Sequence, residues 1–256
     1  MVQLTTFRFS PHLSLTQAAI AALFAGACNV FAFAPFGYWP IQILALALLF
    51  HLLLQATSVK AGVLLGWLYG FGWSVTCVYW LYISMHQYGG MPAPLAALAV
   101  ALLALLLGAF TALATGLATR FRRDRAVPAW IMLLLVLPAL WMFSEWLRGW
   151  VLTGFPWAVS GYAHTASPLT GYAPLIGVYG LGWLVAVLAA CLVLLPGKKS
   201  AGALLLAIMA LGLGLKSLSW TTPNGLPVSV RLLQGNVPQE IKFDAEQINL
   251  CLLYTS

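Results

Sequence analysis

The sequence predicts an all-α polytopic membrane helix bundle with seven spans, followed by the start of an α/β domain. Hydrophobic residues make up 62% of the 256 residues and charged residues only 7%, whereas soluble domains carry roughly 25% charged residues. The apolar residues form long runs that are separated by short charged, glycine-containing or proline-containing links. Beyond Trp220 the composition becomes that of an ordinary soluble domain. These observations place most of the chain in the membrane class.

The first two apolar runs are predicted to form a helical hairpin. Residues 1–14 are a short polar leader, and the first run covers 15–34. The sequence PFGY at 35–38 ends this run, because proline and glycine interrupt helices. The second run covers 39–54 and is short for a membrane-spanning helix, which needs about 20 residues. We therefore expect an aromatic turn between two packed helices.

Five further runs complete the predicted transmembrane bundle, which covers residues 15–220. They lie at 61–83, 95–119, 128–143, 172–195 and 201–218. Gly62, Gly66 and Gly70 recur every four residues in the first of them. Such small-residue faces let membrane helices approach closely, so this helix is expected to pack tightly against a neighbour.

The basic residues between the runs predict the orientation of the bundle. Alternate loops, counted from the leader, contain most of them: Arg8, Lys60, Arg120, Arg122, Arg123, Arg125, Lys198 and Lys199. The opposite loops contain only Arg148 before the seventh run ends near Lys216. Because cytoplasmic loops are rich in lysine and arginine, we expect a cytoplasmic N-terminus. Residues 84–94, 145–157 and everything after 218 would then lie on the outer face.

Composition also excludes several kinds of site. The net charge of +7 comes from short clusters that form no basic face, so no nucleic-acid partner is expected. The four cysteines form no CxxC pair, and none lies beside a histidine at the spacing of metal ligands, so we expect neither a metal nor a disulfide framework. No cofactor is implied. The isolated histidines His51, His86 and His164 are expected to be incidental.

Residues 221–250 are predicted to begin a soluble domain. The sequence TTPNG at 221–225 is a turn-rich linker. The alternation at Val228 and Val230, which ends at Gly235 and Asn236, predicts a first strand, and 239–250 resembles the start of an amphipathic helix. About 30 residues cannot bury a core of their own, so we expect the chain to be a fragment of a longer protein. Residues 251–256 fit poorly as a continuation and are expected to be a non-native tail.

The stretch from Pro138 to Trp183 contains the candidate binding site. Glu145 is the only acidic residue within an apolar span, and Arg148 follows three residues later. An ionisable residue in such a setting is a functional-site hypothesis. Two interpretations remain open. The two side chains share a helical face, so they either form an ion pair that locks the helix to its neighbours, or Arg148 binds a phospholipid phosphate while Glu145 holds it in place.

Aromatic residues surround this pair. Trp141, Trp146, Trp150 and Trp157 fit an interfacial aromatic belt. The sequence TGFPW at 153–157 is more specific, because its glycine and proline together imply a fixed bend that displays two aromatic rings. We predict that a mouth between membrane and water binds lipid substrates through six of these residues: Glu145, Trp146, Arg148, Phe155, Pro156 and Trp157.

Five motifs in a specific order carry a family resemblance. They are FAPFGYWP at 33–40, SEWLRG at 144–149, TGFPW at 153–157, GYAPLIGVYG at 171–180 and LQGNVPQ at 233–239. Their order and spacing resemble the bacterial apolipoprotein N-acyltransferases, over a region from about Gln17 to Asp244. Each motif alone is a weak signal, whereas five in order are a strong one.

The resemblance implies a multi-pass protein of the bacterial inner membrane. Family members have eight spanning helices, with a periplasmic nitrilase-like α/β/β/α domain between the seventh and the last. They take an acyl chain from a phospholipid, usually phosphatidylethanolamine, and hold it as a thioester on cysteine. They then transfer it to the α-amino group of a diacylglyceryl-modified lipoprotein. The implied partners are therefore the phospholipid acyl donor, the lipoprotein and membrane lipids, and the family chemistry requires no cofactor.

The departures from the family pattern concern the chemistry. The family's Glu-Lys-Cys triad lies downstream of the equivalent of Gln234-Gly235-Asn236, and neither Glu246 nor Cys251 matches a triad motif. No catalytic residue is therefore assigned, the eighth helix is expected to be missing, and the chain alone is predicted to be inactive. Phe243 occupies a position where the family places an aromatic residue near the lipid-facing opening, so it is a further candidate for substrate contact.

Two other functions fit parts of the pattern. A small-solute transporter would use glycine-rich helices and a membrane-embedded ion pair, and it predicts broken helices around a polar site near the midplane. Here the charges lie at the ends of the runs. A non-catalytic membrane scaffold is the other alternative, and a transfer assay on these 256 residues distinguishes it from an enzyme.

Overall fold

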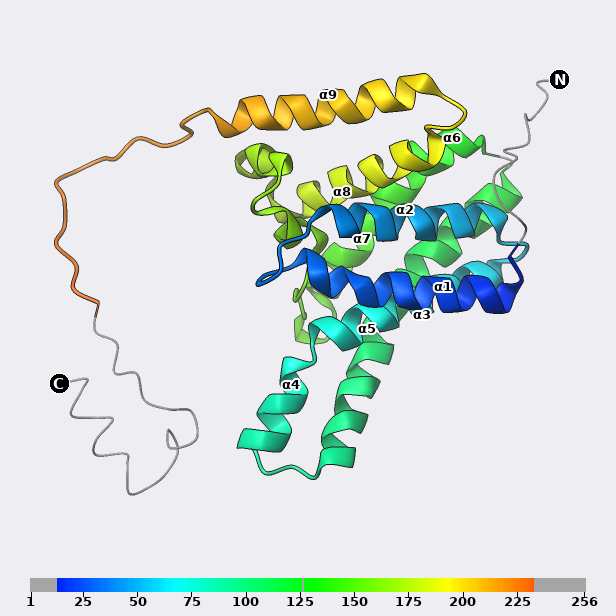
Figure 1. Cartoon of the computed structure of the whole chain (residues 1–256), viewed down its shortest axis with the longest axis horizontal. Helices are drawn as coiled ribbons and strands as arrows, with labels where there is room; N and C mark the ends of the chain where they lie inside the picture. The colour runs from blue at the N-terminus through cyan, green and yellow to red at the C-terminus, as the bar shows by residue number, and fades with distance from the viewer. Residues whose placement is uncertain (1–12, 126, 233–256) are drawn as a thin grey trace.

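The computed structural model describes residues 13–125 and 127–232, and every regular element in this part is helical (Figure 1). The longer elements are α1 (Leu15–Cys28), α2 (Pro40–Gln55), α3 (Val59–Cys77), α5 (Ala93–Asp124), α7 (Leu137–Arg148), α8 (Ala173–Leu194) and α9 (Lys199–Lys216). Short pieces join them: η1 (Asn29–Ala32), α4 (Trp80–Ile83), η2 (Ser84–Tyr88), α6 (Ala129–Ile131), η3 (Met132–Val136), η4 (Val151–Thr153), η5 (Ser160–His164) and η6 (Pro168–Tyr172).

Each predicted apolar run is helical, and the chain forms a helical bundle of the membrane type. Within the described residues, five helices are long and apolar enough to cross a membrane. The pair 59–77 and 80–88, bent by 47°, is a sixth candidate span. Helix α2 is apolar but has only 16 residues, so length and composition do not identify it as a span.

Side-chain caps explain several helix ends. Ser14 begins α1 with a reciprocal capping box, in which its hydroxyl accepts from the Gln17 amide while the Gln17 side chain accepts from the Ser14 amide. At its other end, α5 ends in a basic turn that suits the helix dipole. Arg122 in this turn donates to the carbonyls of Leu54 and Ala56. The loop after α2 is thereby fixed to the end of α5.

Helices α3 and α5 pack closely, as the glycine repeat predicts. A Cβ added at Gly62, Gly66 or Gly70 would lie 2.1, 1.9 or 2.7 Å from a threonine hydroxyl of α5. The three hydroxyls belong to Thr119, Thr115 and Thr111, respectively. Since normal contacts need more than 3 Å, only glycine allows this approach.

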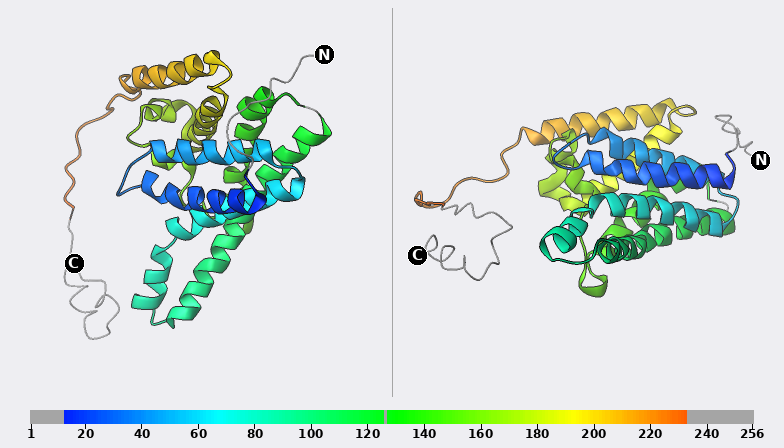
Figure 2. Two further views of the ribbon diagram at one scale, coloured as in Figure 1. Left: turned by 45° about the vertical axis from the view of Figure 1, so that its right-hand side comes forward. Right: turned by 60° about the horizontal axis from the view of Figure 1, so that its bottom comes forward.

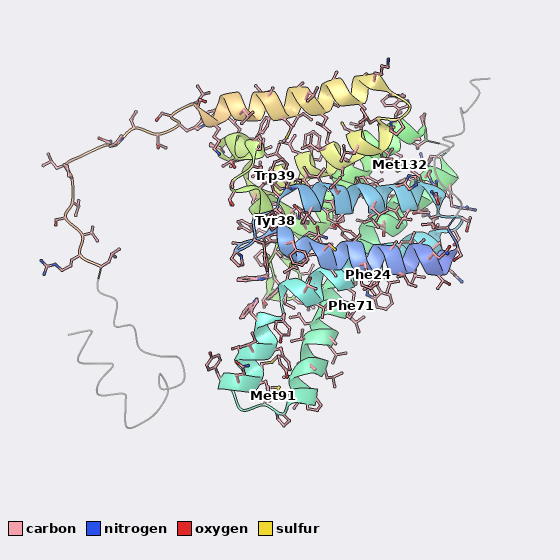
Figure 3. All side chains as sticks on the ribbon, viewed as in Figure 1. Phe24, Tyr38, Trp39, Phe71, Met91 and Met132 are labelled. Carbon is pink, nitrogen blue, oxygen red and sulfur yellow. The ribbon has the colours of Figure 1, made fainter. Side chains whose placement is uncertain are left out.

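The figures show how the elements are arranged around this pair. Helices α1, α2 and α8 run side by side, α9 covers one side of the bundle, and α4 with the first part of α5 projects from the other (Figures 1 and 2). Tyr38 and Trp39 lie near one end of the bundle, whereas Met132 lies toward the other (Figure 3). The 149–172 connection lies at the end near Tyr38.

Residues 219–232 have no regular structure and run away from the helices (Figure 1). The strand predicted over 227–236 is therefore not formed in its described part, 227–232. The physical reason is that a strand needs a hydrogen-bonding partner strand, and the described part of the chain contains none. Residues 233–236, the helix predicted at 239–250, Phe243 and the predicted tail at 251–256 lie outside the described residues.

Candidate functional site

The connection between α7 and α8 has a strained backbone. Three non-glycine residues have positive φ: Leu152 (53°), Thr153 (74°) and Ala158 (52°). Gly154 has φ 81°, and a Cβ there would lie 2.0 Å from the Gly149 carbonyl oxygen. Residues other than glycine rarely adopt such conformations, which persist where the surrounding structure imposes them and which concentrate at functional sites. This feature identifies 149–160 as a candidate site.

Glu145, in the last turn of α7, binds Ser160 of this connection. Its side chain is only 3% exposed. Its Oε1 accepts hydrogen bonds from the Ser160 amide and the Ser160 hydroxyl, each at 2.8 Å. Trp141 donates from its indole to the same hydroxyl at 3.1 Å. Behind the carboxylate stands Gly182 of α8, where an added Cβ would lie 2.6 Å from Oε2.

Arg148, the last residue of α7, binds the same connection at Trp157. Its Nη1 donates to the Trp157 carbonyl at 2.9 Å, and its guanidinium carbon lies 5.9 Å from the centre of the Trp73 ring. Trp73 in turn stacks on Trp141, with ring centres 5.7 Å apart. A cation over an aromatic face is stabilised electrostatically.

Glu145 and Arg148 do not pair directly with each other. Within residues 13–125 and 127–232, the only ion pair joins Arg120 and Asp124, at 3.2 Å. The direct ion pair considered from the sequence is therefore not formed. The lipid-phosphate alternative stays a prediction: Arg148 Nη1 donates to the Trp157 carbonyl, whereas Nη2 has no partner in the described structure.

A cavity of about 520 Å³ lies beside this connection. Residues from three parts of the chain line it: Val30, Phe33, Ala34, Cys77, Trp80, Pro156, Trp157, Ala158 and Tyr162. Trp157 closes against the bundle, since its indole donates to the Cys77 carbonyl at 3.1 Å and its ring lies 5.1 Å from that of Trp80. The lining contains no charged side chain, so the cavity suits an apolar ligand.

The predicted site residues do not all face this cavity. Pro156 and Trp157 line it, whereas Trp146 lines a separate cavity of about 480 Å³ with Met142, Ile176, Tyr179, Gly180 and Trp183. Phe155 packs against a small cluster formed by Val78, Val100 and Leu107. Glu145 and Arg148 lie behind the connection, as described above. The residues predicted to form one mouth therefore lie in separate places. Some line one of the two apolar cavities, whereas Glu145 and Arg148 bind the connection from behind.

Three residues of this arrangement were not predicted from the sequence. Ser160 of the following connection and Gly182 of α8 meet Glu145, and Trp73 of α3 meets Arg148. None of these contacts follows a helical or strand spacing, so no local pattern marks them. The only sequence signal for them was the presence of an acidic residue in an apolar run, which requires partners.

His164 is not isolated, contrary to the expectation from the sequence. It is fully buried, with Nε2 3.1 Å from Gln42 Oε1 and Nδ1 3.2 Å from the Ser167 hydroxyl. These distances fit a neutral imidazole with its proton on Nε2. Burial lowers the pKa of His164 from 6.5 to about 4. The residue therefore joins α2 to the 149–172 connection as an uncharged group.

In residues 13–125 and 127–232, the side chains that commonly bind metal ions do not cluster. No group of three or more histidine, cysteine, aspartate or glutamate side chains comes together in the described part of the chain.

Comparisons with known proteins agree with the motif resemblance. Residues 25–191 match the family model described as the apolipoprotein N-acyltransferase N-terminal domain. The chain is similar to apolipoprotein N-acyltransferases of Ralstonia nicotianae (45% identity, 96% of this chain and 47% of the relative) and Azotobacter vinelandii (43%, 91% and 46%). A relative from Nitrosomonas europaea is 42% identical over 90% of this chain. The chain spans about half the length of the curated relatives it matches.

Proposed function

Because the chain belongs to the apolipoprotein N-acyltransferase family, we propose that it forms the membrane domain of an enzyme that N-acylates lipoproteins. The observation that carries the proposal is the family match over residues 25–191. That region contains the last turn of α1, all of α2 to α7, most of α8, the 149–172 connection and both apolar cavities. The substrates proposed for the reaction are a phospholipid acyl donor and a lipoprotein with an N-terminal diacylglyceryl-cysteine.

In the proposed reaction, a cysteine thiol takes an acyl chain from the phospholipid and releases the lysophospholipid. The lipoprotein α-amino group then takes the acyl chain from the thioester, which forms an amide and frees the thiol. A Glu-Lys-Cys triad downstream of residue 236, in a nitrilase-like domain that begins at 221–250, would perform these steps. The residues described in the structure position substrates. Moving an acyl chain out of the membrane costs about 0.8 kcal/mol for each CH₂ group. An apolar cavity within the bundle avoids this cost.

We propose that the two cavities contact the acyl chains of the substrates. Pro156 and Trp157 would contact one chain in the larger cavity, and Trp146 would contact another in the second cavity. Glu145 and Arg148 would contribute by holding the cavity wall, and Phe155 by packing that wall onto α5. Phe243 stays a candidate for contact near the lipid-facing opening.

The proposed topology has seven spans, a cytoplasmic N-terminus and a periplasmic C-terminal part, in the bacterial inner membrane. Two features of the arrangement support it. The start of α1 and the end of α9 lie at opposite ends of the bundle (Figure 1), as an odd number of crossings requires. The links after α2, α5 and α8, which carry the basic clusters, lie at the end where α1 starts (Figure 1).

The transporter alternative is less well supported. A transporter would place charged or polar groups at a broken helix near the midplane. The break between α3 and α4 is followed by 79–88, a segment without aspartate, glutamate, lysine or arginine. The buried charges lie instead at the end of α7.

A chimera tests the proposed function. Residues 1–232 are joined to the C-terminal half of the Ralstonia relative, and conversion of diacylated to triacylated lipoprotein is followed by mass spectrometry in cells depleted of their own enzyme. We expect the chimera to acylate lipoprotein and the 256-residue chain alone to be inactive. Transfer by the chain alone, or no transfer by a well-expressed chimera, would contradict the proposal.

A variant of this chimera tests the larger cavity. Trp157→Ala is expected to lower kcat/KM about tenfold, the effect of losing roughly 1.4 kcal/mol of apolar contact. Trp150→Ala is the matched control, since Trp150 is 68% exposed and lines neither cavity. Equal losses in the two variants would show that the aromatic residues act only as a membrane belt.

A further inference from the structure

We infer that Glu145 and Arg148 are positioning residues that hold residues 156–162, the strained segment that forms one wall of the 520 Å³ cavity, at two points. The carboxylate binds the amide at one point of the segment, and the guanidinium binds the carbonyl at another. This role depends only on the described geometry and is independent of the proposed acyl transfer.

The two anchor points lie three residues apart on the wall segment. Arg148 Nη1 donates to the carbonyl of Trp157 at 2.9 Å, and Glu145 Oε1 accepts from the amide and the hydroxyl of Ser160, each at 2.8 Å. The Arg148 guanidinium stays charged, and hydrogen bonds in which one partner is ionised are roughly twice as strong as neutral ones. The two charges lie one helical turn apart on α7, so a single rigid helix sets both anchor points.

Ala158 lies between the anchors and has φ 52°. An L-residue reaches this left-handed region at a cost in free energy and stays there only when its surroundings require it. Its neighbour Val159 is fully buried, and a Cβ added at Gly161 would lie 2.2 Å from the Val178 carbonyl of α8. The segment is therefore held by hydrogen bonds from α7 on one side and by close packing against α8 on the other.

The held segment forms one side of the cavity. Pro156, Trp157, Ala158 and Tyr162 line it, and Trp157 reaches across to the Cys77 carbonyl. Releasing either anchor lets Ala158 leave its strained conformation, which moves Trp157 away from Cys77. The pair of charges thus determines how closed the cavity is, although neither Glu145 nor Arg148 lines it.

Accessibility of the Cys77 thiol tests this inference in the purified 256-residue protein in lipid nanodiscs. Cys77 lines the cavity, and Cys28, exposed on α1, is the internal reference. Cys191 and Cys251 are replaced by serine. The alkylation rate of each remaining thiol by a membrane-permeant maleimide is measured by mass spectrometry of the peptides.

We expect Glu145→Ala and Arg148→Met each to raise the Cys77 rate about tenfold, as loss of a hydrogen bond to a charged group predicts, without changing the Cys28 rate. Glu145→Gln keeps an acceptor for Ser160 and should stay close to the unsubstituted rate. Ala158→Gly in the Glu145→Ala background should lower the Cys77 rate again, because glycine adopts positive φ without strain. If Glu145→Ala caused a general structural defect instead, adding Ala158→Gly would not lower the Cys77 rate.

Unchanged Cys77 labelling in both Glu145→Ala and Arg148→Met would overturn the inference, as would no rescue by Ala158→Gly. If Glu145→Ala misfolds, the Cys28 rate will rise together with the Cys77 rate. The single variants Arg148→Met and Ser160→Ala then decide the question. If none of the variants raises Cys77 labelling selectively, the inference is wrong. None of these measurements requires acyl transfer. The inference about the wall segment can therefore fail while the proposed function holds, and the reverse is also possible.

Discussion

Gly182 of α8 is as important to the site as the charged residues themselves. It gives Glu145 Oε2 room next to the α8 backbone, since an added Cβ would lie 2.6 Å from that oxygen. Glu145 cannot move away without losing its two hydrogen bonds to Ser160. A requirement for glycine at this position follows from the contact between two helices. The sequence GLGW at 180–183 contains two glycines and does not show which of them meets the carboxylate.

Gly182→Ala is therefore expected to destabilise the bundle by about 1–3 kcal/mol, the usual cost of overpacking. The measurement is the thermal unfolding midpoint in detergent. Gly214→Ala is the control, because a Cβ there meets nothing within 4 Å and alanine favours the helix. We expect Gly214→Ala to leave the midpoint unchanged or raise it. Equal midpoints for the two variants would contradict the described packing around Glu145.

His164 predicts a dependence of stability on pH. Its pKa is about 4 in the folded protein, lowered from 6.5 by burial. Between these two values the unfolded chain binds more protons than the folded one, so folding stability is fully present above about pH 6.5 and is lost as the pH falls toward 4. The loss amounts to at most about 3 kcal/mol, at 1.36 kcal/mol for each pKa unit.

Unfolding midpoints measured between pH 7 and pH 4.5 check this prediction. We expect the midpoint to fall with decreasing pH, and we expect His164→Gln to be less stable at pH 7 but to show a smaller fall. The Gln side chain fills part of the site and does not titrate. If the two proteins lose the same stability over this range, other groups cause the pH dependence.

At the scale of helices, the contact between α3 and α5 depends on paired small residues. A Cβ at Gly66 would lie 1.9 Å from Thr115 Oγ1 and 2.8 Å from its Cβ. Trp67 also donates from its indole to the Leu105 carbonyl of α5 at 2.9 Å. The two helices therefore cannot separate slightly without losing this contact as well.

Gly66→Ala is expected to lower the unfolding midpoint, because α3 and α5 must move apart. Adding Thr115→Ala removes the hydroxyl and methyl groups from the contact and should restore part of the loss. A double-mutant cycle measures the coupling between the two positions. If the two effects are simply additive, the helices do not meet at this pair.

Element positions were largely predictable from the sequence, and their irregularities were not. The predicted runs at 39–54, 172–195 and 201–218 match α2, α8 and α9 to within two residues, since long apolar stretches bounded by polar or proline-containing links give a strong local signal. The run predicted over 61–83 instead breaks after Cys77 and bends by 47°. No proline marks that break. It coincides with the contact of Trp157 on the Cys77 carbonyl, which depends on the tertiary structure.

At the scale of the whole molecule, the sequence motifs pointed to the end of α7 and the connection after it, and that this region binds substrate stays a prediction. The motifs at 144–149 and 153–157 identified the region, but the direct pairing of Glu145 with Arg148 and a single shared mouth were not found. Which side chain faces which cavity depends on three segments that meet only after the bundle forms: the turn at 30–34, the end of α3 and the 149–162 connection.

The orientation of the bundle is the premise on which the proposed function depends, and cysteine accessibility in cells tests it most directly. Single cysteines replace Thr153, in the 149–172 connection, and Asp124, the last residue in the basic end of α5. Both residues are exposed in the structure. A membrane-impermeant maleimide is added to cells with a permeabilised outer membrane. We predict labelling at 153 in these cells, in which the inner membrane is intact, and at 124 only after the inner membrane is disrupted. The reverse pattern would place the aromatic cavities on the cytoplasmic side and contradict the account.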